Sequence, residues 1–155
     1  MTNNEVQINE FALESLLLAG RIMIESGAEI YRVEDTIQRM AQSQNIMNVQ
    51  SYVTSTGIIL SLGPTQPTRI TSIARRSTDL EKVALVNAVS RKLSTQIITL
   101  AEAHDELQKI QSTNYFLPTY VQVIAAAIAS GSFLIMFNGQ WQDFFAAMVA
   151  GGMGY

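Results

Sequence analysis

The distribution of charged side chains constrains this chain more than any other feature. Of its 23 Asp, Glu, Lys and Arg residues, 22 lie at or before Lys109, and Asp143 alone follows. The 33 residues from 110 to 142 therefore carry no such charge. A helix of a soluble domain normally keeps a polar face toward water. The sequence thus predicts two parts in different surroundings: a cytoplasmic α+β domain over 1–112 and a membrane region over 113–155.

The membrane region opens with an apolar segment long enough to cross a bilayer. Residues 116–137 number 22 and lack charge. As a helix they would extend roughly 33 Å, against roughly 30 Å of bilayer hydrocarbon. Tyr115 and Tyr120 lie near one end and Trp141 near the other, as is typical of interfacial aromatics. The alternative is a buried central helix of a globular protein.

Small residues within this segment predict close packing with another helix. Ala125 and Ala129, and Ala126 and Ser130, recur at helical spacing. A second apolar segment starts at about residue 143. Residues 144–155 number only 12, which is too few to cross a bilayer. We therefore expect a second span that is truncated in this sequence.

The basic residues and the N-terminus predict the orientation of the span. The N-terminal residues lack a basic stretch followed by an apolar core, so they do not resemble a signal peptide. Arg91, Lys92 and Lys109 precede the span, whereas residues 138–142 contain no Lys or Arg. We expect the chain to contact the lipid bilayer, with its N-terminal domain in the cytoplasm.

The first 112 residues predict a domain of two helices, three antiparallel strands and two further helices. Apolar residues at helical spacing favour helices over 8–26 and about 30–44, with Gly27 ending the first. Short β-branched segments, separated by Gly and Pro, favour a small antiparallel sheet; they are 49–54, 57–62 and 68–74. The predicted fold class is α+β, followed by α-helical membrane spans.

Two capping patterns predict where the last two helices of this domain begin. Thr78-x-x-Glu81 and Thr99-x-x-Glu102 both match the capping box, in which a Thr and a Glu three residues later satisfy each other's backbone N–H groups. We therefore expect helices that start near residues 78 and 99.

Few residues suit catalysis or metal binding. The chain has no cysteine, and His104 is its only histidine, so no second His or Cys can share a metal ion. We interpret His104, within the polar segment AEAHDEL, as a solvent-exposed surface residue. No block of basic residues suggests nucleic acid. We predict no catalytic residue, no metal and no cofactor.

The segment from residue 27 to residue 36 is the densest group of candidate functional residues. The candidates for substrate binding are Gly27, Glu29, Tyr31, Arg32 and Glu34. A Gly-Ala break allows a tight turn, and an arginine can offer two parallel donors to a carboxylate. In the structural alternative Arg32 pairs with a nearby acid, while Tyr31 and Val33 pack in the domain.

Two stretches resemble the bacterial threonine/serine exporter family. They are LLLAGRIMIESGAEIYRVEDTIQRMA and ITSIARRSTDLEKVALVNAVSRKLSTQIITLAEAHDELQKI, and the resemblance covers most of residues 13–150. It implies part of an exporter of small polar metabolites in a bacterial inner membrane, driven by the proton motive force. Threonine and serine are the implied cargo, or dicarboxylates such as succinate in members split into two subunits.

The resemblance also implies what is absent from this chain. Family members have several further spans, supplied by the C-terminal half of the chain or by a small polytopic partner subunit. We therefore expect an oligomer and no transport by this chain alone. The competing hypothesis is a membrane-anchored hydrolase-like or regulatory domain.

Overall fold

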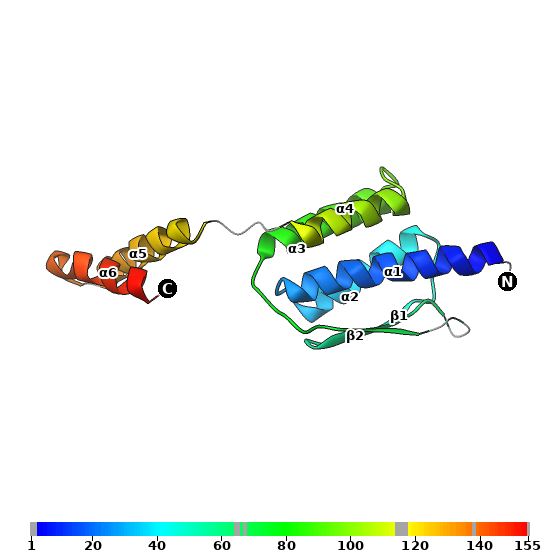
Figure 1. Cartoon of the computed structure of the whole chain (residues 1–155), viewed down its shortest axis with the longest axis horizontal. Helices are drawn as coiled ribbons and strands as arrows, with labels where there is room; N and C mark the ends of the chain where they lie inside the picture. The colour runs from blue at the N-terminus through cyan, green and yellow to red at the C-terminus, as the bar shows by residue number, and fades with distance from the viewer. Residues whose placement is uncertain (1–2, 64–65, 67, 114–117, 138, 155) are drawn as a thin grey trace. The chain divides into compact units, whose positions relative to one another are not determined.

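The computed structural model describes residues 3–63, 66, 68–113, 118–137 and 139–154. The chain forms two compact units, Met1–Tyr115 and Phe116–Tyr155 (Figure 1). Each unit has its own helices.

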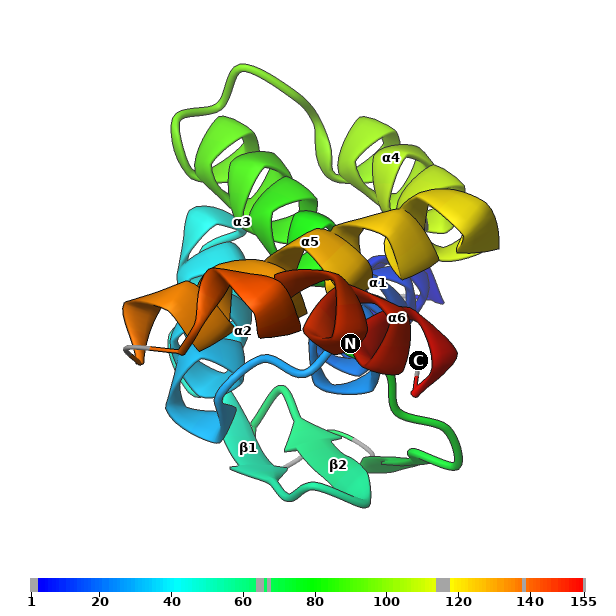
Figure 2. The ribbon, with the colours of Figure 1, turned by 90° about the vertical axis from the view of Figure 1, so that its left-hand side faces the viewer.

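The first unit combines four helices with a small sheet. Its elements are α1 (Asn3–Glu25), α2 (Ile30–Ser43), β1 (Gln50–Val53), β2 (Gly57–Ser61), β3 (Arg69–Ser72), α3 (Leu80–Ser94) and α4 (Leu100–Ser112). The order of two helices, three strands and two helices is the predicted one. Figures 1 and 2 show three layers, with α1 and α2 between the sheet on one side and α3 and α4 on the other.

The sheet has the order β1-β2-β3, and both pairs of strands are antiparallel. Tyr52 lies opposite Ile59, which lies opposite Ile70, so these three side chains share one face. They are exposed, whereas Ile58 and Leu60 on the other face of β2 are fully buried. The alternation places the helices against one face of the sheet only.

The helix α1 forms the centre of the core because it packs against both outer layers. This position explains its wide apolar surface: Leu16, Ala19 and Met23 are almost completely buried. From α2, Val33, Ile37 and Met40 pack into the same core, and Val86 and Leu107 reach it from the third layer. Each large aliphatic side chain buried in this way contributes about 1.5–3 kcal/mol to folding.

One of the two predicted capping boxes is present and the other prediction is wrong. The Thr99 hydroxyl accepts from the backbone N–H of Glu102, and the Glu102 carboxylate accepts from the backbone N–H of Thr99. At the start of α3, Asp79 is the cap instead of Thr78, because its carboxylate accepts from the backbone N–H of Lys82 at 3.1 Å. The aspartate next to the threonine is the cap, so the helix begins one residue later and the capped donor is the N–H of Lys82 in place of the N–H of Glu81.

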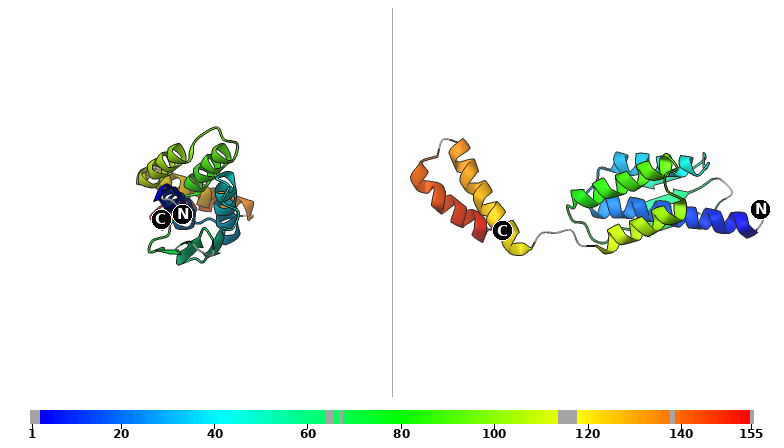
Figure 3. Two further views of the ribbon diagram at one scale, coloured as in Figure 1. Left: turned by 90° about the vertical axis from the view of Figure 1, so that its right-hand side faces the viewer. Right: turned by 90° about the horizontal axis from the view of Figure 1, so that it is seen from above.

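The second unit is a helical hairpin made of α5 (Thr119–Met136), a short 3-10 helix, η1 (Trp141–Asp143), and α6 (Phe144–Met153) (Figure 3). Small residues let the two helices approach each other, as the sequence predicted. A Cβ atom on Gly151 would overlap the side chain of Ser130, and one on Gly131 would lie 2.8 Å from Met148 Cγ. The contact is therefore closed to larger side chains at these two positions.

Within the described residues, α5 is the one helix whose length and composition would let it cross a membrane. It covers 119–136 of the predicted span 116–137, and residues 116 and 117 lie outside the described residues. Gly131 alone is buried among its residues. A large apolar surface therefore faces outward, including Ile124, Ile128 and Phe133.

Candidate functional site

The predicted candidate Gly27 ends α1 in a specific turn. Its N–H donates to the carbonyl of Ile24 at 3.1 Å, and the N–H of Ala28 donates to the carbonyl of Met23 at 2.9 Å. These two bonds define a Schellman motif, which requires a positive φ at its glycine, and Gly27 has φ +85°. The turn is tied to the segment before α3, because Ser77 N–H donates to the Glu25 carbonyl at 2.7 Å. Gly27 therefore has a structural reason to be glycine.

The other four predicted candidates lie at the exposed start of α2. Arg32 Nε lies 3.5 Å from a Glu29 carboxylate oxygen and donates to the Tyr31 hydroxyl at 3.3 Å. The Tyr31 hydroxyl, helped by the Glu29 carboxylate, raises the pKa of Arg32 above its ordinary value. Tyr31 is exposed, and Glu34 is partly buried.

This arrangement matches the structural alternative for Arg32 but not for Tyr31. The arginine pairs with a neighbouring acid and Val33 is fully buried, as that alternative holds, whereas 63% of Tyr31 is exposed. Glu29, Tyr31 and Arg32 form a small exposed cluster, and none of the four side chains lines the groove described below. Their role in substrate binding stays a prediction.

The interpretation of His104 as a solvent-exposed residue is wrong. His104 is 7% exposed, and its Nδ1 lies 2.9 Å from the hydroxyl of Ser15 on α1. Its Nε2 lies 3.0 Å from the Gln108 amide nitrogen, and its ring lies 4.9 Å from that of Phe11. The helix is polar on the side facing water, but α1 covers the histidine. The sequence pattern of α4 alone could not reveal that neighbour.

The pairing of Ser15 with His104 has the residue types of a hydrolase but not the geometry. Ser15 is completely buried, and its hydroxyl donates to the carbonyl of Phe11 at 2.9 Å. The hydroxyl can then accept from Nδ1, while Nε2 accepts from Gln108, which satisfies a neutral imidazole. A nucleophile must reach its substrate, and its general base must accept the proton. Here the serine is inaccessible and the histidine serves to join α1 to α4.

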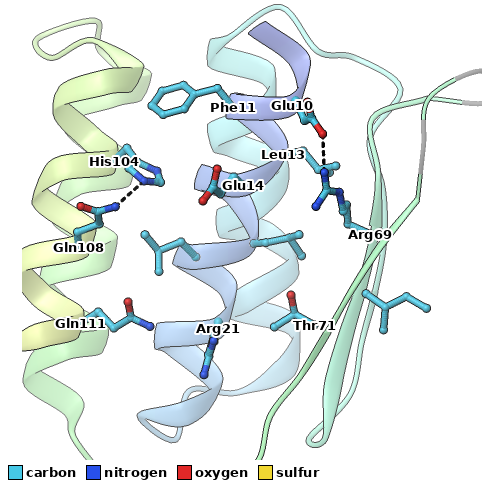
Figure 4. A pocket seen from close by; sticks show the side chains of 13 residues that line it. Glu10, Phe11, Leu13, Glu14, Arg21, Arg69, Thr71, His104, Gln108 and Gln111 are labelled. Atoms are coloured by element: carbon cyan, nitrogen blue, oxygen red, sulfur yellow. Dashed lines mark hydrogen bonds and ion pairs between the residues drawn. The ribbon is translucent and has the colours of Figure 1, made fainter. Parts of the chain in front are cut away.

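The described residues contain a groove of about 560 Å³ along the outward face of α1. In Figure 4 one wall is α4, with His104, Gln108 and Gln111, and the other is β3, with Arg69 and Thr71. Leu13, Leu17, Leu18 and Ile70 supply apolar surface to the groove, and Phe11 lies next to His104. This volume lies within the usual range of small-molecule sites.

Charged side chains of both signs line this groove. Arg69 pairs with Glu10, and Arg21 Nε donates to Glu25 Oε1 at 2.8 Å. Glu14 lies in the middle of the groove (Figure 4). It forms no ion pair or hydrogen bond with any residue that the structure describes. The groove thus contains one free carboxylate between two arginines that are already paired.

Other charged residues lie outside the groove. No three His, Asp or Glu side chains in the described parts of the chain are placed to hold a metal ion. Arg75 and Arg76 are exposed between β3 and α3. Asp143 lies at the start of α6, where its side chain makes no capping hydrogen bond.

Comparison with known proteins defines the class to which this two-unit chain belongs. The model of the family described as "Putative threonine/serine exporter" matches residues 14–155, and the chain belongs to that family. A "Probable threonine/serine exporter" of Mycobacterium tuberculosis is 23% identical over 145 residues, which cover 91% of this chain. The aligned region is 27% of that protein, so the chain spans about a quarter of its length. No solved structure matches the chain.

Proposed function

We propose that the chain is the N-terminal part, or one subunit, of an exporter of small polar metabolites driven by the proton motive force. Threonine and serine are the first candidates for cargo, and dicarboxylates such as succinate are the second. Family membership supports a transporter over an enzyme. The observation that carries the proposal is the pair of uncharged helices α5 and α6, whose outward apolar surface suits lipid or further helices.

In this proposal the first unit is cytoplasmic and the hairpin enters the inner membrane. The first unit has a core of its own and carries 22 of the 23 charged residues. Two helices cannot enclose a transport path. The remaining helices would come from the rest of a longer chain or from a small polytopic partner subunit, and the assembly would be oligomeric. Glu29, Tyr31 and Arg32 are exposed and Glu34 is partly exposed, which suits contact with that assembly or with an anionic substrate.

An efflux assay tests the function. The gene that encodes this chain is deleted in its source strain and restored on a plasmid in its native context. Cells are loaded with labelled L-threonine, L-serine or succinate, and the label that appears outside is followed with and without a protonophore. Deletion should slow the efflux of at least one of the three, and the plasmid should restore it. Unchanged efflux of all three refutes the proposal.

A labelling assay tests the topology separately. The chain has no cysteine, so single cysteines can be introduced at the exposed residues Met47 and Gln140. A maleimide that cannot cross the membrane should label Gln140→Cys in intact cells, because the turn of the hairpin faces outward. It should label Met47→Cys only after the cells are opened. Labelling of Met47→Cys in intact cells contradicts the proposed orientation.

A further inference from the structure

We propose that the groove between α1, α4 and β3 binds a small zwitterion, a molecule that carries an ammonium group and a carboxylate like those of a free α-amino acid. Glu14 would bind the ammonium group, and Arg21 would bind the carboxylate. The inference goes beyond the proposed function, because it concerns a site on the first unit and requires no transport.

The spacing of the two charged residues on α1 fits such a ligand. Glu14 and Arg21 are seven residues apart, so their backbones are separated by roughly 10.5 Å along the same helix face. Two hydrogen bonds of roughly 2.9 Å and a zwitterion a few ångströms long fill that interval. Leu17 and Leu18 lie between them and line the groove, which gives an apolar surface for the carbon atoms of the ligand.

The ion pairs of the groove show which charged groups are free to bind a ligand. Glu14 has no partner among the described residues, while its neighbour one turn earlier, Glu10, is neutralised by Arg69. The unpaired carboxylate of Glu14 is therefore the group in the groove that can accept charge-assisted hydrogen bonds from a cation. Arg21 uses Nε for Glu25, and its two terminal nitrogens donate to no other described group. Those nitrogens can form the paired donors that suit a carboxylate.

The walls of the groove add neutral polar groups near Arg21. In Figure 4, Gln111 on α4 and Thr71 on β3 flank the Arg21 end from opposite sides. Neither side chain makes a hydrogen bond within the described residues, although the backbone carbonyl of Gln111 accepts from Lys82 Nζ at 3.1 Å. A ligand with a short polar side chain would find donors and acceptors there. A simple amine or a dicarboxylate would leave one of the charged residues unused.

Titration calorimetry of the purified full chain in detergent tests the site. The probes are L-serine, ethanolamine, which lacks the carboxylate, 3-hydroxypropanoate, which lacks the ammonium group, and succinate. L-serine should bind at least tenfold more tightly than each of the other three. Absence of L-serine binding at millimolar concentration overturns the inference. So does equal or tighter binding of ethanolamine, 3-hydroxypropanoate or succinate.

Variants locate the binding. Glu14→Gln and Arg21→Gln should each weaken L-serine binding by tenfold or more. Asp105→Asn and Arg39→Gln are the matched controls. Asp105 is an exposed acid outside the groove, and Arg39 pairs with Asp35 one turn away, as Arg21 does with Glu25. The controls should bind as the unchanged chain does, and thermal unfolding checks that all four variants fold. Unchanged affinity in Glu14→Gln overturns the inference.

The two proposals can fail independently. Binding of L-serine to the purified chain, without any effect of deletion on efflux, would refute the exporter and retain the site. Efflux that depends on the gene, together with no heat of L-serine binding, would refute the site and retain the exporter.

Discussion

Replacement of Ser15 by alanine tests the buried contact that joins α1 to α4. The serine is completely buried and His104 is 7% exposed, so water has little access to His104 Nδ1 once the hydroxyl is removed. A buried polar group without a partner costs about 1–3 kcal/mol. In a domain of this size each kcal/mol lowers the melting temperature by about 4 °C, so the expected decrease is about 4–12 °C.

The measurement is thermal or urea unfolding of the full chain in detergent, followed by circular dichroism. Ser43→Ala is the matched control, because the Ser43 hydroxyl donates only to a carbonyl of its own helix, that of Met40 at 2.7 Å. The double variant Ser15→Ala/His104→Leu removes both polar partners and should recover part of the loss. If Ser15→Ala unfolds within about 0.5 kcal/mol of the unchanged chain, the buried hydrogen bond does not have the role assigned to it.

Four further substitutions, one of them with a matched control, test other features. Gly27→Ala forces an alanine to φ +85° next to the Ser77 carbonyl, and it should destabilise the first unit by about 1–2 kcal/mol in urea unfolding. A loss of less than about 0.5 kcal/mol in unfolding free energy would show that alanine is not strained at this φ. Thr99→Ala removes half of the capping box and should cost about 1 kcal/mol. The backbone N–H and hydroxyl of Thr99 lower the pKa of Glu102 below its ordinary 4.5. The stability that Glu102 contributes is therefore present above pH 4.5 and lost as the pH falls through the lower folded value, and Glu102→Gln should flatten that part of the pH profile. Gly151→Ala should separate α5 from α6, whereas Gly152→Ala, whose Cβ would lie 3.6 Å from Ala127 Cβ, should be tolerated. The fluorescence of Trp141, the chain's one tryptophan, follows the unfolding of the hairpin. If Gly151→Ala and Gly152→Ala unfold alike, α5 and α6 do not pack closely at Gly151.

Local patterns predicted the parts of the fold that depend on neighbouring residues. The order of helices and strands follows from spacing, and Gly27 and Thr99 end and begin helices where their chemistry requires. The prediction failed at Thr78 because Asp79, one residue later, caps the helix by accepting from the next backbone donor along the chain, the N–H of Lys82. Helix caps are decided by which side chain reaches the donor, and the pattern alone does not rank two candidates.

The groove and the buried histidine could not be predicted from the sequence. Ser15 and His104 are 89 residues apart, and Glu10 and Arg69 are 59 residues apart. Each residue looks like an ordinary member of a polar helix or strand face in its own segment. Only the packing of α1 between two layers brings them together. The sequence thus indicated the exposed segment after Gly27, whereas the cavity lies on the flank of the preceding helix.

The position of α1 has a consequence for how substitutions combine. Its flank carries Glu14 and Arg21, and its C-terminal end carries the Gly27 turn that is bonded to the segment before α3. A helix is stiff over this length, so a substitution that shifts it affects both places. Substitutions at these two places should therefore not be additive in unfolding free energy, and a double variant that combines them is the way to detect the coupling.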